Sequence, residues 1–349
     1  MRRKHALLAA VAALAVVAGL VVEVFFPASP AAAVVGVLNV DYFQASLRVA
    51  VPIAFAALGG IFAERSGVIN IGLEGLLIIS AFTGIAVSGW ANGSVSPGMA
   101  AWLGFFAAVA ASALFALLFA VVTIDLKADQ VIAGLAVWLI ALGLAPYATR
   151  VIWGSTTSGT VPTLGNWVVP GLAEIPVVGP VFFDANPTVY MLLVAVPLSW
   201  YVLQSTPFGR WVRASGENPR ALDTAGVNVR KVRYASVLLS GVLSGVGGAG
   251  LSLSLGQFIG SGATMVDGRG WIGITAFLFG NYNPVGAFGA SLLFAALSAL
   301  EIRLQTLGFS VSQTLIRLVP YVVVIVVLAF VGRTRTPDAA GDHYESGEE

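Results

Sequence analysis

The stretch RYASVLLSGVLSGVGGAGLSLSL, residues 233–255, decides which class of protein this chain belongs to. Beyond its first residue it holds no charge, and it is longer than the ~20 mostly apolar residues that a helix needs to cross a bilayer. Gly241, Gly245 and Gly248 recur at spacings that let helices approach closely in lipid. The stretch therefore predicts a membrane-spanning helix packed against other helices.

The whole chain has the same character. Of its 349 residues 58% are hydrophobic and 10% are charged, and the mean hydropathy is +0.90. Soluble domains are about half apolar and about a quarter charged. We therefore expect an all-α integral membrane protein, a polytopic bundle of about ten helices. The apolar runs place these helices near 6–26, 45–63, 66–88, 99–122, 130–149, 187–206, 233–255, 270–280, 284–302 and 314–331. The run at 270–280 is too short to cross alone, so a tilted or re-entrant helix is expected there.

The distribution of positive charge orients the bundle. Cytoplasmic loops of membrane proteins carry an excess of Lys and Arg. With both termini in the cytoplasm, 13 of the 18 Lys and Arg fall inside and five fall outside. The five outer residues are Arg48, Arg150, Arg269, Arg303 and Arg317. We therefore predict that both termini and the segment 207–232 lie in the cytoplasm, with 150–186 as the longest extracytoplasmic loop.

The two ends of the chain differ from the membrane domain, which we place at 1–331. The apolar run 6–26 follows Arg2, Arg3 and Lys4, which predicts an extra N-terminal helix; a cleaved signal peptide has a similar pattern. The final segment, 332–349, is polar and is expected to be a disordered cytoplasmic tail.

A possible internal repeat relates two stretches of the membrane domain. IFAERSGVINIGLEGLLIISA (61–81) and LFGNYNPVGAFGASLLFAALS (278–298) each lead from an apolar end through a polar turn into a Gly-containing apolar helix. Paired structural repeats are common in transporters. Chance similarity between apolar, Gly-rich segments is the alternative.

The cytoplasmic segment 207–232 carries an unusual concentration of charge. Residues 209–233, GRWVRASGENPRALDTAGVNVRKVR, hold six of the 18 basic residues. Asn218 suits an N-cap, Pro219 the first helical position and Gly226 the residue past the end, so a two-turn helix is predicted at Pro219–Ala225. Isolated helices this short are marginal. Either the helix packs on the chain itself, or it docks on another chain. A basic loop that only fixes topology and touches anionic lipid is the plainer interpretation.

ASGENPRALDTAGVNVRKVRY (214–234) resembles the coupling segment of permease subunits of bacterial ABC importers, and within them the nucleoside branch of the branched-chain amino-acid and ribose-type permease family. ERSGVINIGLEG (64–75), ADQVIAGLAVWLIALGL (128–144) and GRGWIGITAFLFGNYNPVGA (268–287) agree with it. The resemblance implies that the short helix sits in a groove of a separate ATPase subunit. The ATPase-coupling residues would be Gly216, Glu217, Asn218, Pro219, Arg220, Ala221, Asp223 and Gly226. It also implies a second permease subunit, identical or different, and an extracytoplasmic solute-binding protein.

The resemblance therefore implies inward transport of a small polar solute, a nucleoside, driven by ATP. The alternatives are a ribose-type sugar or branched-chain amino-acid permease, or an ion-coupled secondary transporter. The chain has no G-x-x-x-x-G-K-[ST] phosphate loop, so it does not hydrolyse ATP itself. It has no Cys, and its two His lie in the polar ends. No catalytic residue, metal, cofactor or nucleic-acid partner is predicted.

Three residues are candidates for the translocation pathway. Glu74 is the one carboxylate well inside a predicted span, and Asn70 stands one turn before it. Ionisable groups in the membrane are costly and usually face the bundle interior or a wet cavity. A hydrogen bond that holds a bent helix would explain Glu74 equally well. Trp138 stands where the family pattern commonly has Asn, and it either stacks on a ring of the solute or packs in the core or against lipid.

Overall fold

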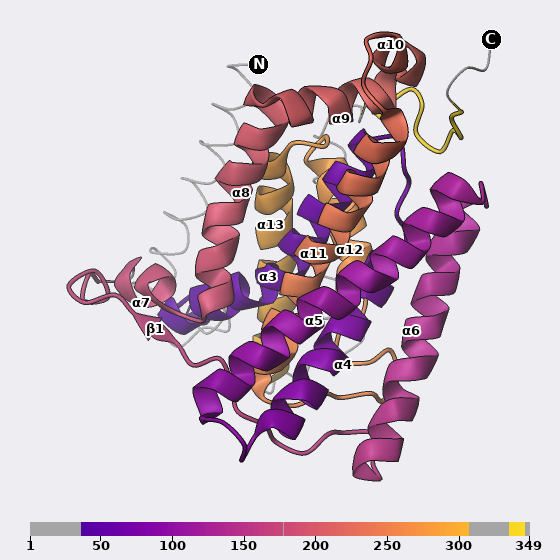
Figure 1. The fold of residues 1–349 in the computed structure, drawn as a ribbon. Coiled ribbons are helices and arrows are strands. Elements are labelled where there is room, and N and C mark those ends of the chain that lie inside the picture. The colour runs from indigo at the N-terminus through magenta and orange to yellow at the C-terminus, as the bar shows by residue number, and fades with distance from the viewer. Residues whose placement is uncertain (1–35, 177, 307–334, 346–349) are drawn as a thin grey trace.

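The computed structural model describes residues 36–176, 178–306 and 335–345, and these form a helical bundle (Figure 1). Seven helices in this part are long and apolar enough to cross a membrane. They are α3 (Val40–Arg65), α4 (Leu73–Ala91), α5 (Pro97–Ala120) with its π-helical extension η1 (Val121–Asp125), α6 (Gln130–Trp153), α8 (Pro187–Ser205), α11 (Val229–Leu255) and α13 (Pro284–Thr306). The predicted helices at 6–26 and 314–331 lie outside the described residues. The polytopic all-α prediction is confirmed.

Most of the shorter elements lie at the two ends of the bundle, and one of them, α12, begins inside it. They are β1 (Trp167–Val168), α7 (Val178–Phe183), β2 (Asp184–Ala185), α9 (Pro207–Glu217), α10 (Pro219–Thr224) and α12 (Arg269–Phe279). The strands β1 and β2 pair antiparallel within the predicted outer loop. On the opposite side, α9 crosses the end of the bundle from α8 to α10 (Figure 1).

Helix α11 is the centre of the bundle and packs against α3, α4 and α5. Its small residues make this possible, as the sequence predicts. A Cβ added at Gly241 would come within 2.4 Å of the Cβ of Ala116, and one at Gly248 within 2.4 Å of the carbonyl oxygen of Leu77. The hydroxyl of Ser112 donates to the Gly241 carbonyl at 2.7 Å, so the close approach also satisfies polar groups in the apolar interior.

The first seven residues of the predicted helix 66–88 are not helical. After α3 ends, residues 66–72 turn back into the bundle, and α4 begins only at Leu73. The amide of Asn70 in this segment donates to Ser240 Oγ at 3.1 Å. Ser240 lies eleven residues into α11, about 16 Å along its axis and so near the middle of a ~30 Å hydrocarbon core. Helix α4 therefore starts deep in the membrane.

Helix α12 also starts inside the bundle and has 11 residues, so the prediction of a helix too short to cross alone is confirmed. The residues before it are tied to the outer loop, because Ser158 N donates to the Phe258 carbonyl at 2.9 Å and Val161 N to that of Gly256 at 2.8 Å. The chain then enters the bundle and forms α12, which runs to the cytoplasmic turn before α13. There Tyr282 donates to Glu64 Oε2 at 2.9 Å. This bond joins the α12–α13 turn to the end of α3, although the repeat itself stays a prediction.

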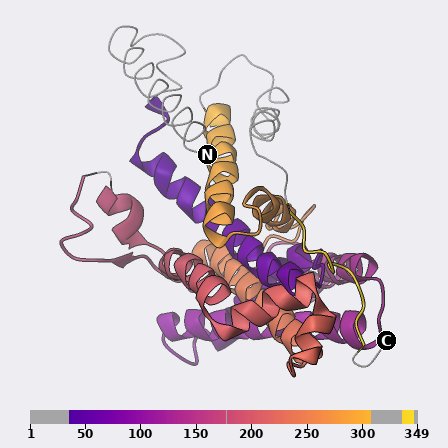
Figure 2. The same cartoon turned by 90° about the horizontal axis from the view of Figure 1, so that it is seen from above.

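The described part of the tail, 335–345, corrects the expectation of disorder for those residues. It lies across the cytoplasmic ends of the helices, as Figure 2 shows in a view onto this side. Ala339 N donates to the Gly216 carbonyl at 2.8 Å, and Gly341 N donates to that of Gly67 at 3.0 Å. Arg233 donates to the Asp342 carbonyl at 2.6 Å. The backbone of this segment thus finds partners on three different elements, which a polar composition does not reveal.

Candidate functional site

The buried side chain of Glu74 joins the start of α4 to the start of α12. Its Oε1 accepts a hydrogen bond from Gly268 N at 2.8 Å, and its Oε2 accepts one from Gly270 N at 2.6 Å. Glu74 is only 2% exposed. The first N–H groups of a helix lack partners inside the helix and carry partial positive charge, so a carboxylate is well suited to this position.

The two helix starts are in direct contact because residue 270 is glycine. A Cβ there would lie 2.5 Å from the backbone nitrogen and Cα of Glu74. Next to it, Arg269 points its NH1 at the carbonyls of Met265 and Val266, both at 2.9 Å. The starts of two broken helices thus meet near the middle of the membrane, where one carboxylate holds them together. We call Glu74, Gly268 and Gly270 the buried junction.

Asn70 supports the segment that leads to this junction. It is 1% exposed, and its Oδ1 accepts from Gly72 N at 3.0 Å while its amide reaches Ser240 of α11. Gln130 Oε1, at the start of α6, accepts from Ile69 N at 2.6 Å. These side chains satisfy backbone and polar groups that a non-helical segment would otherwise leave unpaired in the membrane.

Trp138 lies beside the junction on α6. A Cβ at Gly75 would come within 2.8 Å of the Trp138 Cα, so α6 passes directly over the first turn of α4. The Trp138 ring meets that of Trp271 on α12 edge to face, with centroids 5.5 Å apart. Both rings are half-buried. The structure thus gathers all three predicted pathway residues around the start of α4.

Sequence reasoning missed the partners of these residues. Gly268, Gly270 and Trp271 belong to the stretch GRGW, and Ser240 to the central helix. An Arg between two glycines, directly before the apolar run 271–279, was a usable signal for the start of a helix. Nothing in the sequence indicates that Glu74 is the group they meet, because 194 residues separate Glu74 from Gly268.

The predicted cytoplasmic helix is confirmed as α10, which ends one residue earlier than expected. Asn218 Oδ1 accepts from Ala221 N at 3.0 Å, Pro219 occupies the first turn, and Gly226 has a φ of +81°, which suits glycine. Leu222 is buried and anchors the helix, whereas Arg220 and Ala221 are exposed. The helix therefore presents an open outer face.

Helix α9 precedes α10 and was not predicted. Thr206 Oγ1 caps it by accepting from Gly209 N at 3.1 Å, and Pro207 starts it, so a Thr-Pro pair was the available signal. Its C-terminal end is fixed to the α3–α4 turn. Ser215 Oγ donates to the Ser66 carbonyl at 2.8 Å, and a Cβ at Gly216 would lie 2.4 Å from the Arg65 carbonyl oxygen.

The tail completes the surroundings of the predicted coupling residues. Tyr344 donates to Asp223 Oδ2 at 2.9 Å, and Arg335 lies 4.0 Å from Glu217 Oε2. Lys127, from the loop before α6, pairs with Glu345. Partial burial and the neighbouring Asp223 carboxylate raise the pKa of Tyr344 above its ordinary value. Among the described residues, no group of His, Cys, Asp or Glu could hold a metal ion.

These features define a polytopic membrane transport protein, with two broken helices meeting at mid-depth and a capped helix open to the cytoplasm. The chain belongs to the family described as "Branched-chain amino acid transport system / permease component", which it matches over residues 42–328. It is therefore a multi-pass permease, as its sequence motifs predict.

Three relatives illustrate the range of this family. The chain is 38% identical to the guanosine ABC transporter permease protein NupQ of Bacillus subtilis, covering 87% of this chain and 96% of the relative. It is 38% identical to the nucleoside ABC transporter permease protein NupC of Lactococcus lactis, covering 84% and 93%. It is 34% identical to the putative glucose ABC transporter permease protein TsgC13 of Haloferax volcanii, covering 79% of each. No solved structure matches the chain significantly.

Proposed function

We propose that this permease imports nucleosides, driven by a separate ATPase subunit. The solute assignment is supported by two relatives at 38% identity that are named for guanosine and for nucleosides and that align over nearly their whole length. A sugar is the second candidate, because the Haloferax relative at 34% identity is named for glucose. The proposed partners are the ATPase, a second permease subunit, an extracytoplasmic solute-binding protein and the surrounding lipid.

The observation that carries the mechanism is the continuous chain of contacts from α10 to the buried junction. Helix α10 has two turns and an exposed face, so it needs a partner to be firmly held. We assign that face to a groove of the ATPase. A shift of α10 moves α9 directly, because Asn218 caps one helix and ends the other.

From α9 the movement reaches the membrane interior. Ser215 and Gly216 hold the end of α9 against the α3–α4 turn, and the segment beyond this turn leads through Asn70 to Glu74. Glu74 holds α12 by two hydrogen bonds. ATP-driven displacement of α10 would thus re-orient α4 and α12 together, opening the pathway alternately to either side. The permease makes and breaks no covalent bonds.

The coupling role is tested by Arg220→Glu in the reconstituted complex. Arg220 is exposed on α10, so the change should leave the melting of the membrane domain unaltered. Uptake and the stimulation of ATP hydrolysis by loaded binding protein should both fall. Lys231→Glu is the matched control, because Lys231 is exposed on α11 and is not one of the eight predicted coupling residues. Normal uptake by Arg220→Glu would remove the docking role of α10. Asp223→Arg should also impair coupling, but it breaks the Tyr344 contact as well.

The solute is tested separately, by uptake of labelled guanosine into proteoliposomes that contain the complex and its binding protein. Unlabelled nucleosides should compete, and glucose and leucine should not. Competition by glucose alone would assign the permease to sugars while leaving the coupling mechanism intact.

A further inference from the structure

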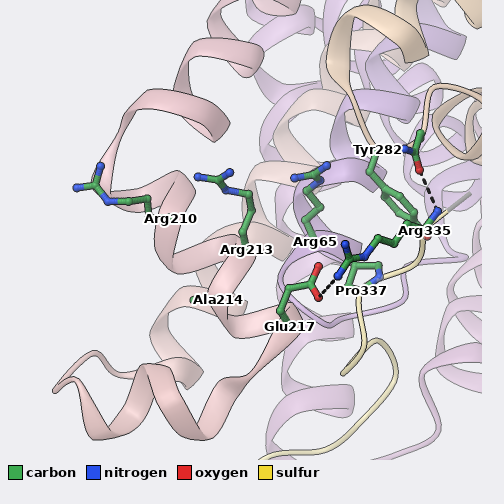
Figure 3. A pocket seen from close by; sticks show the side chains of 9 residues that line it. Arg65, Arg210, Arg213, Ala214, Glu217, Tyr282, Arg335 and Pro337 are labelled. Carbon is green, nitrogen blue, oxygen red and sulfur yellow. Dashed lines mark hydrogen bonds and ion pairs between the residues drawn. The ribbon is translucent and has the colours of Figure 1, made fainter. Parts of the chain in front are cut away.

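A basic cavity of about 460 Å³ opens on the cytoplasmic side between α9, the end of α3, the α12–α13 turn and the tail (Figure 3). Its charged and polar lining consists of Arg65, Arg210, Arg213, Glu217, Tyr282 and Arg335, with Asn281 at its edge. In Figure 3, Arg65, Arg210 and Arg213 stand in a row, and their guanidinium groups lie at one level. Of these lining residues, only Glu217 is one of the predicted coupling residues.

The positive charge of the cavity is largely uncompensated. Its single carboxylate, Glu217, faces Arg335 at 4.0 Å. No ion pair within 4.0 Å joins Arg65, Arg210 or Arg213 to a carboxylate of the described residues. Arg213 Nε donates to the Gly209 carbonyl at 3.3 Å, which orients the side chain and leaves its two terminal nitrogens for another partner. Like charges gathered in this way repel each other unless an anion joins them.

The position of the cavity is that of the lipid headgroups. Arg65 is the last residue of the spanning helix α3, and α9 starts two residues after the spanning helix α8 ends. Helix α9 carries Phe208 and Trp211 as well as its arginines, which is typical of a helix that lies in the membrane interface. Basic pockets between helices on the cytoplasmic side are suited to anionic headgroups.

We propose that Arg65, Arg210 and Arg213 form a binding site for a phosphate group. A guanidinium presents a planar fork of donors that matches phosphate oxygens two at a time. Guanidinium groups that line one cavity can donate together to a phosphate, and the bound anion would tie α9 to the end of α3. The phosphate can belong to an anionic phospholipid of the inner leaflet or to a soluble phosphate compound. The proposal is independent of the transported solute.

The lipid source is tested by reconstituting the complex in phosphatidylcholine nanodiscs with or without phosphatidylglycerol. Mass spectrometry then measures the phosphatidylglycerol retained on the protein after brief detergent extraction. Arg213→Gln should lower the retained lipid about tenfold, as expected for the loss of one charge-assisted contact. Lys231→Gln removes one exposed positive charge from the same side and should retain as much lipid as the unmodified protein.

The soluble source is tested in phosphatidylcholine nanodiscs alone, by titrating inorganic phosphate and guanosine monophosphate and recording the melting temperature. Saturable stabilisation that Arg213→Gln weakens would assign the site to a soluble phosphate. Arg213→Lys keeps the charge but loses the fork, so it should bind either probe with intermediate strength. Arg213→Lys also controls for misfolding, because it keeps the positive charge on α9.

Two results would overturn the proposal. The first is that Lys231→Gln loses as much phosphatidylglycerol as Arg213→Gln, which would reduce the cavity to part of a diffuse basic surface. The second is that neither probe binds while the arginine variants weaken only the affinity for the ATPase subunit. The cavity would then be a protein-docking surface. Neither readout requires uptake, so a wrong solute assignment leaves both interpretable.

Discussion

Two short helices of this permease are capped at their starts by side chains, and they differ in where the capping side chain comes from. We expect this difference to distinguish changes that damage the fold from changes that damage coupling. Helix α12 has 11 residues, and Glu74 caps it inside the membrane from another helix. Helix α10 has six residues, and its own Asn218 caps it at the cytoplasmic surface. The first cap is a tertiary contact between segments far apart in the sequence. The second is a local contact within one segment, so it does not fix the position of α10 relative to the rest of the bundle.

This difference predicts where changes act. The buried junction has its partners within the chain, so altering it should damage the fold and transport together. The exposed helix lacks such support on its outer face, so altering it should damage coupling and spare the fold. Comparing melting temperature with uptake therefore distinguishes the two regions.

The largest effect is expected from Gly270→Ala. The added Cβ would lie 2.5 Å from the Glu74 backbone, which cannot move without displacing α4. Overpacking in a close-packed interior costs about 1–3 kcal/mol or more. Thermal unfolding of the purified complex should shift strongly downward, and uptake should be lost. Gly289→Ala on α13 is the matched control, because nothing lies within 4 Å of its added Cβ. Equal melting of the two variants would show that the two helix starts are not in contact.

Glu74→Gln should have the next largest effect. An amide offers one acceptor oxygen where the carboxylate offers two, so either Gly268 N or Gly270 N loses its partner. An unpaired buried donor costs roughly 1–3 kcal/mol. We expect impaired uptake and a lower melting temperature, with the assembly intact on size-exclusion chromatography. Glu174→Gln, an exposed residue of the outer loop, makes the same chemical change as a control. Full activity and unchanged melting of Glu74→Gln would contradict the role of the junction.

Asn218→Ala should impair coupling without lowering the melting temperature, in contrast to the two variants of the buried junction. Loss of an N-cap costs about 1 kcal/mol of helix stability, which is large for a helix of two turns. Uptake and the response of ATP hydrolysis to loaded binding protein should fall by several-fold, about as expected for that free energy. Melting of the membrane domain should not change. Asn218→Asp preserves the cap and should restore coupling. If it failed to do so, Asn218 would act through a contact with the partner instead.

Local signals in the sequence predicted much of the fold. Hydropathy located the spans, and Asn218, Pro219 and Gly226 gave the boundaries of α10 to within one residue. The polar turn predicted within 61–81 is present, but the length of the non-helical segment 66–72 could not be predicted, because Val68, Ile69 and Ile71 continue an apolar pattern. Gln130 accepts from the backbone N–H of Ile69, and Ser240 accepts from the side-chain amide of Asn70. No local pattern reveals either contact.

The sequence indicated Asn70, Glu74 and Trp138 as candidates, but it indicated neither their partners near the start of α12 nor their roles. Glu74 stood out as a carboxylate in an apolar span, yet only the structure shows that both its oxygens are occupied by the start of α12. Trp138 was ambiguous from sequence, and its neighbour Trp271 gives it a defined place at the junction. The tail was expected to be disordered on composition, whereas a few backbone hydrogen bonds to distant turns fix residues 335–345 in place.

The smallest effect is expected from Tyr344→Phe, which asks whether the tail shares in setting the position of α10. The change removes only the hydrogen bond to Asp223. This bond is partly exposed, so we expect the lower end of the about 0.5–1.5 kcal/mol that a net hydrogen bond contributes, and uptake should stay within roughly threefold of normal. The pKa of Tyr344 is raised by burial and by the Asp223 carboxylate, so its contribution is complete below the ordinary tyrosine pKa and is lost only as the pH rises through the raised value. The difference in uptake between Tyr344→Phe and the unmodified protein should therefore be constant across neutral pH and should vanish in strong alkali.

Tyr147→Phe, which changes an exposed tyrosine on α6, controls for the loss of a hydroxyl elsewhere. A coupling defect as large as that of Asn218→Ala would mean that the tail, rather than the cap, holds α10 in the orientation that its partner recognises.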